Sequence, residues 1–409
     1  MKFRVFFAGI LLIALGCREQ AIPEVTIQQD VHILASDSLM GRETGREGAE
    51  MAAAYLEKRM RELRLQPFDT DKDFTQDFSF QPKKDPHSQA EYGGATDSSI
   101  NAKNLLGYID NGGSRTVILG AHYDHLGMGG EGSLHRGEPA VHNGADDNAS
   151  GVATLLKLTK KLQEWPEAAD NYLIIFFSGE EIGLLGSNYF AKNPTLDLGQ
   201  VSYMINLDMV GRLREDRTLS VSGTGTTPIW PQLLNSLNPD FKLVLNESGV
   251  GPSDHTSFYL QDIPVLHFFT GQHEDYHKPS DDAEKLNYEG MEEIAAYLFD
   301  LIKAMEAQQE VAFRKTKNES EQTPRFKVTL GVIPDYLYSG EGMRIDGVSE
   351  DRPAQKAGLQ KGDVVVKLGD STIVDMMSYM RALSSFEEGQ TTTVVVERKG
   401  EKVTAEVTF

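Results

Sequence analysis

Short apolar segments alternate with longer helical stretches through the middle of this 409-residue chain. Runs of four to eight mainly apolar residues predict buried strands, and apolar residues recurring at helical spacing predict helices. The predicted strands are 116–121, 172–177, 201–207 and 264–269, and the predicted helices are 48–65, 150–162, 184–192, 229–237 and 288–306. Strands separated by helices indicate an α/β sheet that helices cover on both faces.

Two polar stretches interrupt this pattern. Residues 81–100 hold few large apolar groups and predict a loop. Residues 314–323, with the sequence RKTKNESEQT, predict a linker, and beyond them the pattern changes to short strands, glycine-rich turns and two short helices. We therefore expect a large domain over residues 25–312, a linker over 313–324 and a small domain over 325–409.

Charge and cysteine content exclude several function classes. The chain has 40 Lys+Arg and 61 Asp+Glu residues, which gives a formal net charge of −21. A nucleic-acid partner is therefore not expected, because binding one needs a basic face. Cys17 is the only cysteine, so neither an intrachain disulfide nor a cysteine-based zinc site can form.

The first residues carry the pattern of an export signal. The basic start MKFR precedes an apolar run over 5–15, and Gly16 stands directly before Cys17. This run is too short to span a bilayer and resembles a bacterial lipoprotein signal, in which the cysteine is lipidated and becomes the new N-terminus. We expect residues 1–16 to be a signal peptide and residues 17–24 a tether. The protein would then be a periplasmic or outer-membrane lipoprotein of the cell envelope, anchored through Cys17. The alternative is an ordinary cleaved signal with an incidental cysteine.

Acidic and imidazole side chains follow the predicted strands of the larger domain. These residues are His122 and Asp124 after the first strand, Glu180 and Glu181 after the second, Asp208 after the third, His277 in the loop after the fourth, and Asp147 at the start of a helix. In α/β sheets, sites form outside the carboxyl ends of the strands. The sequence therefore predicts that these side chains meet at one edge of the sheet.

The chemistry of this set points to metal. Imidazoles with several carboxylates and no thiolate suit zinc, and cobalt or manganese can substitute. The number of carboxylates favours two ions, which a bridging carboxylate can hold about 3.5–4 Å apart. The adjacent Glu180 and Glu181 can divide the work. One can bind metal while the other takes a proton from water and passes it to a leaving amine.

Six motifs occur in order and carry a family resemblance. They are AHYDH (121–125), GADDNASG (144–151), FFSGEEIGLLGS (176–187), NLDMVGR (206–212), PSDHTSF (252–258) and YHKPSDD (276–282). Together they resemble the M28 zinc metallopeptidases of the co-catalytic aminopeptidase type, over residues 25–310. The upstream LASDSLMGRETGREG (34–48) resembles the segment that these enzymes carry before the catalytic core. The resemblance implies a zinc-exopeptidase-like mixed sheet flanked by helices.

The resemblance also implies roles for single residues. His122 and Asp208 would bind the first zinc ion, Glu181 and His277 would bind the second, and Asp147 would bridge both. Glu180 would be the general base. Asp124 would support His122 from behind. Several family members have a disulfide near the loop that corresponds to PSDH, which this chain cannot form.

The C-terminal region resembles a PDZ domain of the bacterial secreted-protease kind. The resemblance is carried by VTLGVIPD (328–335) and RPAQKAGLQKGDVVVKLGD (352–370). It implies a groove that takes an extended C-terminal peptide as an added strand, with residues 330–333 on one side and a helix over 376–383 on the other. The alternative is a domain that packs on the peptidase and binds nothing.

We therefore expect an exported di-zinc aminopeptidase that releases N-terminal residues from peptides, with a PDZ domain that recruits or orients a partner. Three alternatives stay open from the sequence. A carboxypeptidase could use the same scaffold and ligands. A glutaminyl cyclase shares the fold and typically uses one zinc ion. A peptide-binding adaptor would keep the PDZ domain as its functional part and need no catalysis.

Overall fold

The computed structural model places most of both domains. It describes residues 22–68, 73–81, 91–92, 99–130, 132–308, 310–316, 328–335, 338, 340–348 and 352–409. The predicted signal peptide, Cys17 and residues 317–324 of the predicted linker lie outside the described residues. Among the helices of the described ranges, none combines the length and hydropathy that a membrane span requires.

The larger domain is built on a mixed sheet, which has ten strands in the described residues. Its order is β3-β2-β4-β6-β5-β7-β10-β8-β9, with β1 beside β4. The strands are β1 (Gln66–Pro67), β2 (Thr75–Gln81), β3 (Glu91–Tyr92), β4 (Ile100–Ile109), β5 (Thr116–His122), β6 (Asn171–Phe177), β7 (Val201–Leu207), β8 (Thr218–Ser222), β9 (Lys242–Asn246) and β10 (Val265–Phe269). The central strands β6, β5, β7 and β10 run parallel, so their carboxyl ends share one edge.

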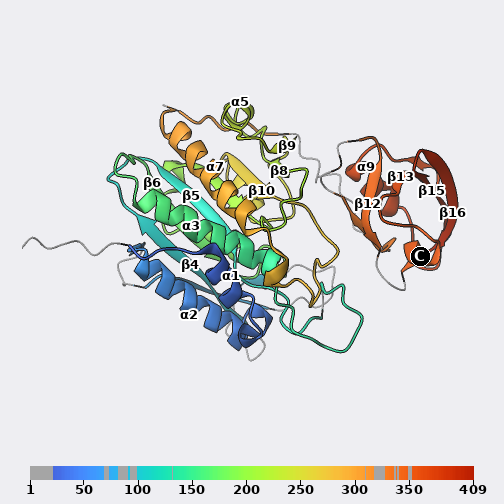
Figure 1. Cartoon of the computed structure of the whole chain (residues 1–409), viewed down its shortest axis with the longest axis horizontal. Coiled ribbons are helices and arrows are strands. Elements are labelled where there is room, and N and C mark those ends of the chain that lie inside the picture. Colours follow the sequence, from blue (N-terminus) through green and yellow to red (C-terminus); the bar gives the residue numbers. More distant parts are fainter. Residues whose placement is uncertain are drawn as a thin grey trace, which may run out of the picture.

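Helices cover the sheet, and short helical turns connect them to the strands. The α-helices are α1 (Ile27–Leu34), α2 (Glu47–Glu62), α3 (Gly151–Gln163), α4 (Leu185–Lys192), α5 (Trp230–Ser236), α6 (His255–Tyr259) and α7 (Tyr288–Glu306). The short turns are η1 (Asp37–Arg42), η2 (Ala145–Ser150), η3 (Leu198–Gln200) and η4 (Ala283–Lys285). Figure 1 shows α3 and α7 lying side by side across one face of the sheet.

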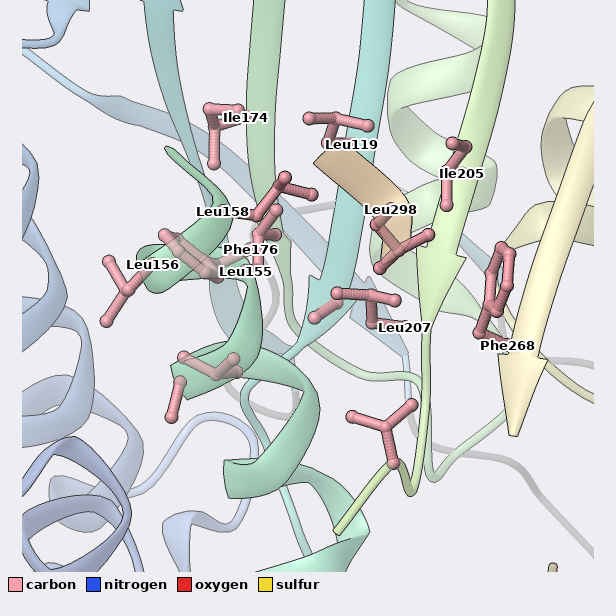
Figure 2. Close-up of a cluster of buried hydrophobic side chains, with 14 of the residues drawn as sticks. Leu119, Leu155, Leu156, Leu158, Ile174, Phe176, Ile205, Leu207, Phe268 and Leu298 are labelled. Atoms are coloured by element: carbon pink, nitrogen blue, oxygen red, sulfur yellow. The ribbon is translucent and has the colours of Figure 1, made fainter. Parts of the chain in front are cut away.

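Alternate residues of the central strands face two separate hydrophobic clusters. Leu119 and Phe176 pack with the leucines of α3 and α7 on one face, as Figure 2 shows. Ile118 and Ile175 point to the other face, where they join Phe190 of α4 and residues of α6. A strand buried on both sides has no polar face, which explains why these segments read as continuous apolar runs in the sequence.

Phe176 offers a direct test of this core. The Phe176→Ala change is expected to lower the free energy of unfolding by about 3–5 kcal/mol, because it leaves a cavity between β6 and α3. Urea unfolding of purified protein measures the loss. Leu260→Ala is the control, since Leu260 is 59% exposed and its loss should stay within about 0.5 kcal/mol. A Phe176→Ala protein as stable as the parent would contradict this packing.

The C-terminal domain is a separate antiparallel sheet with its own buried core. Its strands are β11 (Val332–Pro334), β12 (Met343–Val348), β13 (Val364–Leu368), β14 (Ser371–Thr372), β15 (Thr391–Arg398) and β16 (Glu401–Thr408), and its helices are α8 (Pro353–Lys356) and α9 (Met376–Leu383). Leu330, Val365 and Tyr379 lie in its hydrophobic cluster. Asp375 caps α9 by accepting a hydrogen bond from the Ser378 amide.

The fold class predicted from the sequence is confirmed for both domains. Each of the four predicted strands matches an observed strand to within one residue at either end, and α7 has the predicted bounds. The prediction that residues 81–100 form a loop is wrong in part. β2 ends at Gln81, the short strand β3 lies at Glu91–Tyr92, and β4 begins at Ile100. β3 is only two residues long and includes the charged Glu91, so it lacks the apolar run from which a strand is predicted.

Candidate metal centre

The predicted ligand residues lie where the central strands end. His122 is the last residue of β5, Asp208 follows β7 directly, and Glu181 lies four residues after β6. Asp147 lies in the short turn η2 that leads into α3, and His277 lies in the loop after β10. Because these strands are parallel neighbours, their carboxyl ends bring residues distant in sequence to one edge.

The side chains form two groups that share Asp147. In the first group, His122 Nε2 lies 3.3 Å from Asp147 Oδ1 and 3.4 Å from Asp208 Oδ1. In the second, His277 Nε2 lies 3.2 Å from Asp147 Oδ2 and 3.2 Å from Glu181 Oε2. Each carboxylate oxygen of Asp147 therefore faces a different histidine.

These spacings fit a pair of zinc ions. Zinc bonds to nitrogen and oxygen are about 2.0–2.1 Å long, so ligands placed tetrahedrally around one ion lie roughly 3.3 Å apart. The four distances of 3.2–3.4 Å match this edge length. Hydrogen bonds from nitrogen to oxygen are usually shorter, with a mode of about 2.9–3.0 Å. The donors are imidazole nitrogens and carboxylate oxygens, which zinc accepts readily.

Charge is concentrated in this buried edge. The side chains of Asp147 and Glu181 are each 6% exposed. Burial by itself would raise the pKa of Asp147, but its contacts with His122 and His277 hold that pKa well below its usual range. Burial would lower the pKa of His277, yet the Glu181 and Asp147 carboxylates outweigh it and raise that pKa well above its usual range. The site therefore stabilises both carboxylates and positive charge beside them, as a cation site requires.

The neighbouring Glu180 and Glu181 have different surroundings. Glu181 Oε1 lies 2.5 Å from His125 Nδ1 while its other oxygen faces His277. Among the described residues, the Glu180 carboxylate has no hydrogen-bond or ion-pair partner. Burial raises the pKa of Glu180 well above its usual range, with a further contribution from Asp208 and Glu181 that the His122 ring opposes. Glu181 is thus held in place and Glu180 is left available.

Asp124 reaches His122 mainly through its main chain. The His122 Nδ1 atom lies 3.2 Å from the Asp124 carbonyl oxygen and 3.8 Å from Asp124 Oδ1. The Asp124 carboxylate instead accepts hydrogen bonds from the Glu180 amide and from Thr44 Oγ1, at 3.2 and 2.9 Å. Asp124 therefore connects His122 to the loop that carries Glu180 and to the segment upstream of α2.

Removing the Thr44 hydroxyl should destabilise the protein. Thr44→Val keeps the shape but leaves the buried Asp124 carboxylate without one of its donors, which is expected to cost about 1–3 kcal/mol of unfolding free energy. Thr44→Ser keeps the hydroxyl and serves as the control. Urea unfolding compares the three proteins. Equal stability of Thr44→Val and the parent would show that this bond contributes nothing.

Two supporting residues near the site were not assigned from the sequence. His125 holds Glu181 through the contact described above. Asp281 Oδ2 accepts the backbone amides of Asp146 and Asp147, at 2.9 and 3.1 Å. Both His125 and Asp281 stand inside motifs that carry the family resemblance, but a motif does not say which member touches which.

The C-terminal domain has the edge strand that its predicted binding mode needs. β11 lies at the end of the sheet order β11-β12-β13-β15-β16. An edge strand presents unpaired backbone groups to which an extended peptide can add. Leu330 is buried, Gly331 has φ 75°, and α9 spans the predicted range 376–383.

Comparisons with known proteins identify both domains. Residues 104–302 match Peptidase family M28, and residues 311–409 match the PDZ domain. Among curated proteins, the chain is 26% identical over 194 residues to the probable lipoprotein aminopeptidase LpqL of Mycobacterium tuberculosis. That alignment covers 43% of this chain and 36% of LpqL. The chain spans 28–41% of the length of four such relatives, LpqL among them.

Solved structures share the fold of the larger domain. A Zn-dependent exopeptidase from Parabacteroides distasonis has a TM-score of 0.54 at 18% identity, covering 69% of this chain and 99% of that chain. A glutaminyl cyclase from Porphyromonas gingivalis has a TM-score of 0.52 at 16% identity, covering 68% and 97%. At these identities the likeness shows the fold alone. The match of residues 104–302 and the match of residues 311–409 show that this chain contains a domain of peptidase family M28 followed by a C-terminal PDZ domain.

Proposed function

We propose that the chain is an exported aminopeptidase with two zinc ions. His122 and Asp208 would hold one ion, Glu181 and His277 the other, and Asp147 would contribute one oxygen to each. The observation that carries the proposal is the position of Asp147 between two histidines, with donor distances of 3.2–3.4 Å on both sides. A purely structural carboxylate would not need a second matching group on its far side.

The chain's own residues divide the remaining work. When bound, the zinc ions polarise the carbonyl of the scissile bond and lower the pKa of a water molecule. The Glu180 carboxylate, which has no other partner among the described residues, would take a proton from the attacking water and give it to the leaving amine. Asp124 accepts a hydrogen bond from the Glu180 main-chain amide, so it would help to position the general base.

The direction of cleavage is supported by the relatives. LpqL is described as a probable aminopeptidase, and the family matched by residues 104–302 is a peptidase family. The resemblance of the motifs to co-catalytic aminopeptidases supports the same reaction. Peptides with a free N-terminus are therefore the proposed substrates.

A glutaminyl cyclase is the second candidate, because a solved structure of that activity shares the fold. Such a transferase closes an N-terminal glutamine on itself and releases ammonia, and it typically uses one zinc ion. The two groups that share Asp147 favour the aminopeptidase.

A panel of reporter substrates separates these functions. Aminoacyl nitroanilides, their N-acetylated forms, C-terminally free N-blocked peptides and a glutaminyl peptide are incubated with zinc-loaded protein. Hydrolysis of the free aminoacyl compounds alone is the expected result, and Glu180→Gln serves as the control for contaminating peptidases. Cleavage of N-blocked peptides from the C-terminus would indicate a carboxypeptidase. Loss of ammonia from the glutaminyl peptide without hydrolysis would indicate a cyclase.

The proposed location is the cell envelope, with the chain anchored through lipid on Cys17. The basic and apolar start of the sequence supports it, as does the description of LpqL as a lipoprotein. In a bacterial host, the parent protein should sediment with membranes and Cys17→Ser should not, because an acyl anchor supplies most of the membrane affinity. Immunoblotting of the soluble fraction and of the detergent-extracted membrane fraction measures how much protein is membrane-bound. An unchanged membrane fraction for Cys17→Ser would overturn the anchor.

The proposed role of the PDZ domain is to bind an extended C-terminal peptide along β11. β11 ends the sheet order among the described residues, and α9 covers the range expected for the other wall of the groove, which supports this mode. The peptide would belong to a substrate or to a partner protein in the same compartment.

A further inference from the structure

Arg42 is a buried cation with an unusual set of partners. Its side chain lies at the end of η1, and the residue is 1% exposed. The guanidinium donates four hydrogen bonds, all to main-chain carbonyl oxygens. The acceptors are Tyr123 O at 2.8 Å from Nε, Leu34 O and Asn143 O at 2.6 Å each from Nη1, and Gly144 O at 3.0 Å from Nη2. No carboxylate of the described residues forms an ion pair with it.

Three of these carbonyls belong to two segments that carry proposed ligands, residues 122–127 (the His122 turn) and residues 143–147 (the Asp147 turn). Tyr123 directly follows His122, so the bond from Arg42 to its carbonyl holds the His122 turn. Asn143 and Gly144 precede Asp147 in the Asp147 turn, and their carbonyls accept the bonds from Nη1 and Nη2 of Arg42. The guanidinium therefore joins two turns that are distant in sequence and that supply the first histidine and the shared carboxylate.

The Asp147 turn is held from its other side by a carboxylate. Asp281 Oδ2 accepts the amides of Asp146 and Asp147. The carbonyls of the turn thus point to a cation and its amides point to an anion. Breaking either contact would leave backbone groups of the turn buried without a partner, which is costly.

The backbone around Arg42 is fitted closely to the His122 turn. The His125 amide donates to the Arg42 carbonyl at 3.2 Å, and the Gly127 amide donates to the Gly41 carbonyl at 2.9 Å. A Cβ atom on Gly41 would stand 2.4 Å from Gly127 O. Arg42 itself has φ 50°, a conformation that is unfavourable for a residue with a side chain. Such a conformation persists where surrounding contacts determine it.

The charge of Arg42 also faces the acids of the site. Burial lowers the pKa of Arg42 to about 10, and the negative charges of Asp147, Asp124, Asp281 and Glu181 oppose that shift. The guanidinium is therefore charged at neutral pH. It offsets the mutual repulsion of carboxylates that are gathered at one buried edge.

We propose that Arg42 is a positioning residue of the metal centre, which fixes the His122 turn and the Asp147 turn at the spacing that two ions need. This inference rests on the proposed function. It assigns a task to the segment 34–48, which lies outside the catalytic loops and supplies no ligand.

Three variants separate this role from general stability. Arg42→Met removes both the charge and the hydrogen bonds. Arg42→Lys keeps the charge, but an ammonium group cannot reproduce the planar fork that meets four carbonyls. Arg59→Met is the matched control, because Arg59 is also a mostly buried arginine of this domain and pairs with Asp30 at 2.9 Å rather than with the ligand turns.

Zinc titration of the metal-free full-length chain by calorimetry, with visible absorption of the cobalt-loaded protein, tests the proposal. We expect Arg42→Met to weaken zinc binding by about 10- to 100-fold and to change the cobalt spectrum, as loss of an outer partner of a ligand does elsewhere. Arg42→Lys should show a smaller loss of affinity with an altered spectrum. Arg59→Met should unfold more easily but keep the parent's affinity and spectrum.

The outcomes distinguish this inference from the proposed function. If the parent chain binds zinc and both Arg42 variants bind it with unchanged affinity and spectrum, the positioning role is overturned and the proposed function stands. If Arg42→Met does not fold, Arg42→Lys decides by the same two readouts. If the folded parent binds no zinc, the proposed function fails and this inference fails with it.

Discussion

The Glu180→Gln protein is expected to keep its zinc and to lose turnover by about 10²–10⁴-fold, the usual contribution of a general base. Glutamine has nearly the same shape, so the loop after β6 should not move. Glu180 belongs neither to the two groups that share Asp147 nor to the other candidate ligand set, His125 with Asp147 and Glu181, so metal content should not change. The side-chain amide of the new glutamine cannot accept a proton from water at neutral pH, so turnover should fall. Steady-state hydrolysis of an aminoacyl nitroanilide, with zinc measured in the same sample, provides the comparison.

Glu181→Gln is the matched control for this result. It changes the adjacent residue in the same way, but it alters a carboxylate that contacts both His277 and His125. We expect it to lose zinc as well as turnover. If Glu180→Gln hydrolysed the reporter at the parent rate, Glu180 would not be the base and another group would have to move the proton.

Asp147→Asn should have the second large effect, because it alters both groups at once. An amide offers one oxygen and one NH₂ group, so it cannot face two ions with two oxygens. We expect zinc affinity to fall by at least about 100-fold, since the loss of a residue that only supports a ligand already costs about 10–100-fold. Turnover should fall with zinc occupancy. Zinc titration of the metal-free variant measures the change.

Asp208→Asn tells a shared ligand from an unshared one. Asp208 belongs to the first group only, where its Oδ1 atom lies 3.4 Å from His122 Nε2. We expect this variant to lose affinity at one position and to retain the other, whereas Asp147→Asn should weaken both. If the two variants showed the same binding curve, Asp147 would not be shared between two ions.

The central strands and the candidate site could be predicted because their chemistry is local. β5, β6, β7 and β10 are short apolar runs, and parallel strands of one sheet must end at a common edge. Once the runs are found, the acids and histidines that follow them are expected to meet. The outer strands were harder. β2 and the first half of β4 mix polar with apolar residues, and β9 is half exposed, so the sequence pattern that predicts a strand is weaker there.

The contacts that hold the site in shape could not be predicted. Arg42 bonds to Gly144, which is 102 residues away, and Asp281 bonds to Asp147, which is 134 residues away. No spacing in the sequence links such pairs. In each pair one partner is a main-chain group, and a backbone carbonyl or amide has no sequence signature of its own.

Zinc content of the full-length, correctly folded chain tests the two-ion centre most directly. Metal-free protein is titrated with zinc, and the bound equivalents per chain are counted after removal of the excess. Two tightly held equivalents are expected, with hydrolysis of the aminoacyl reporter rising as they bind. One equivalent, or none, in a chain that folds normally would contradict a centre in which Asp147 serves two ions.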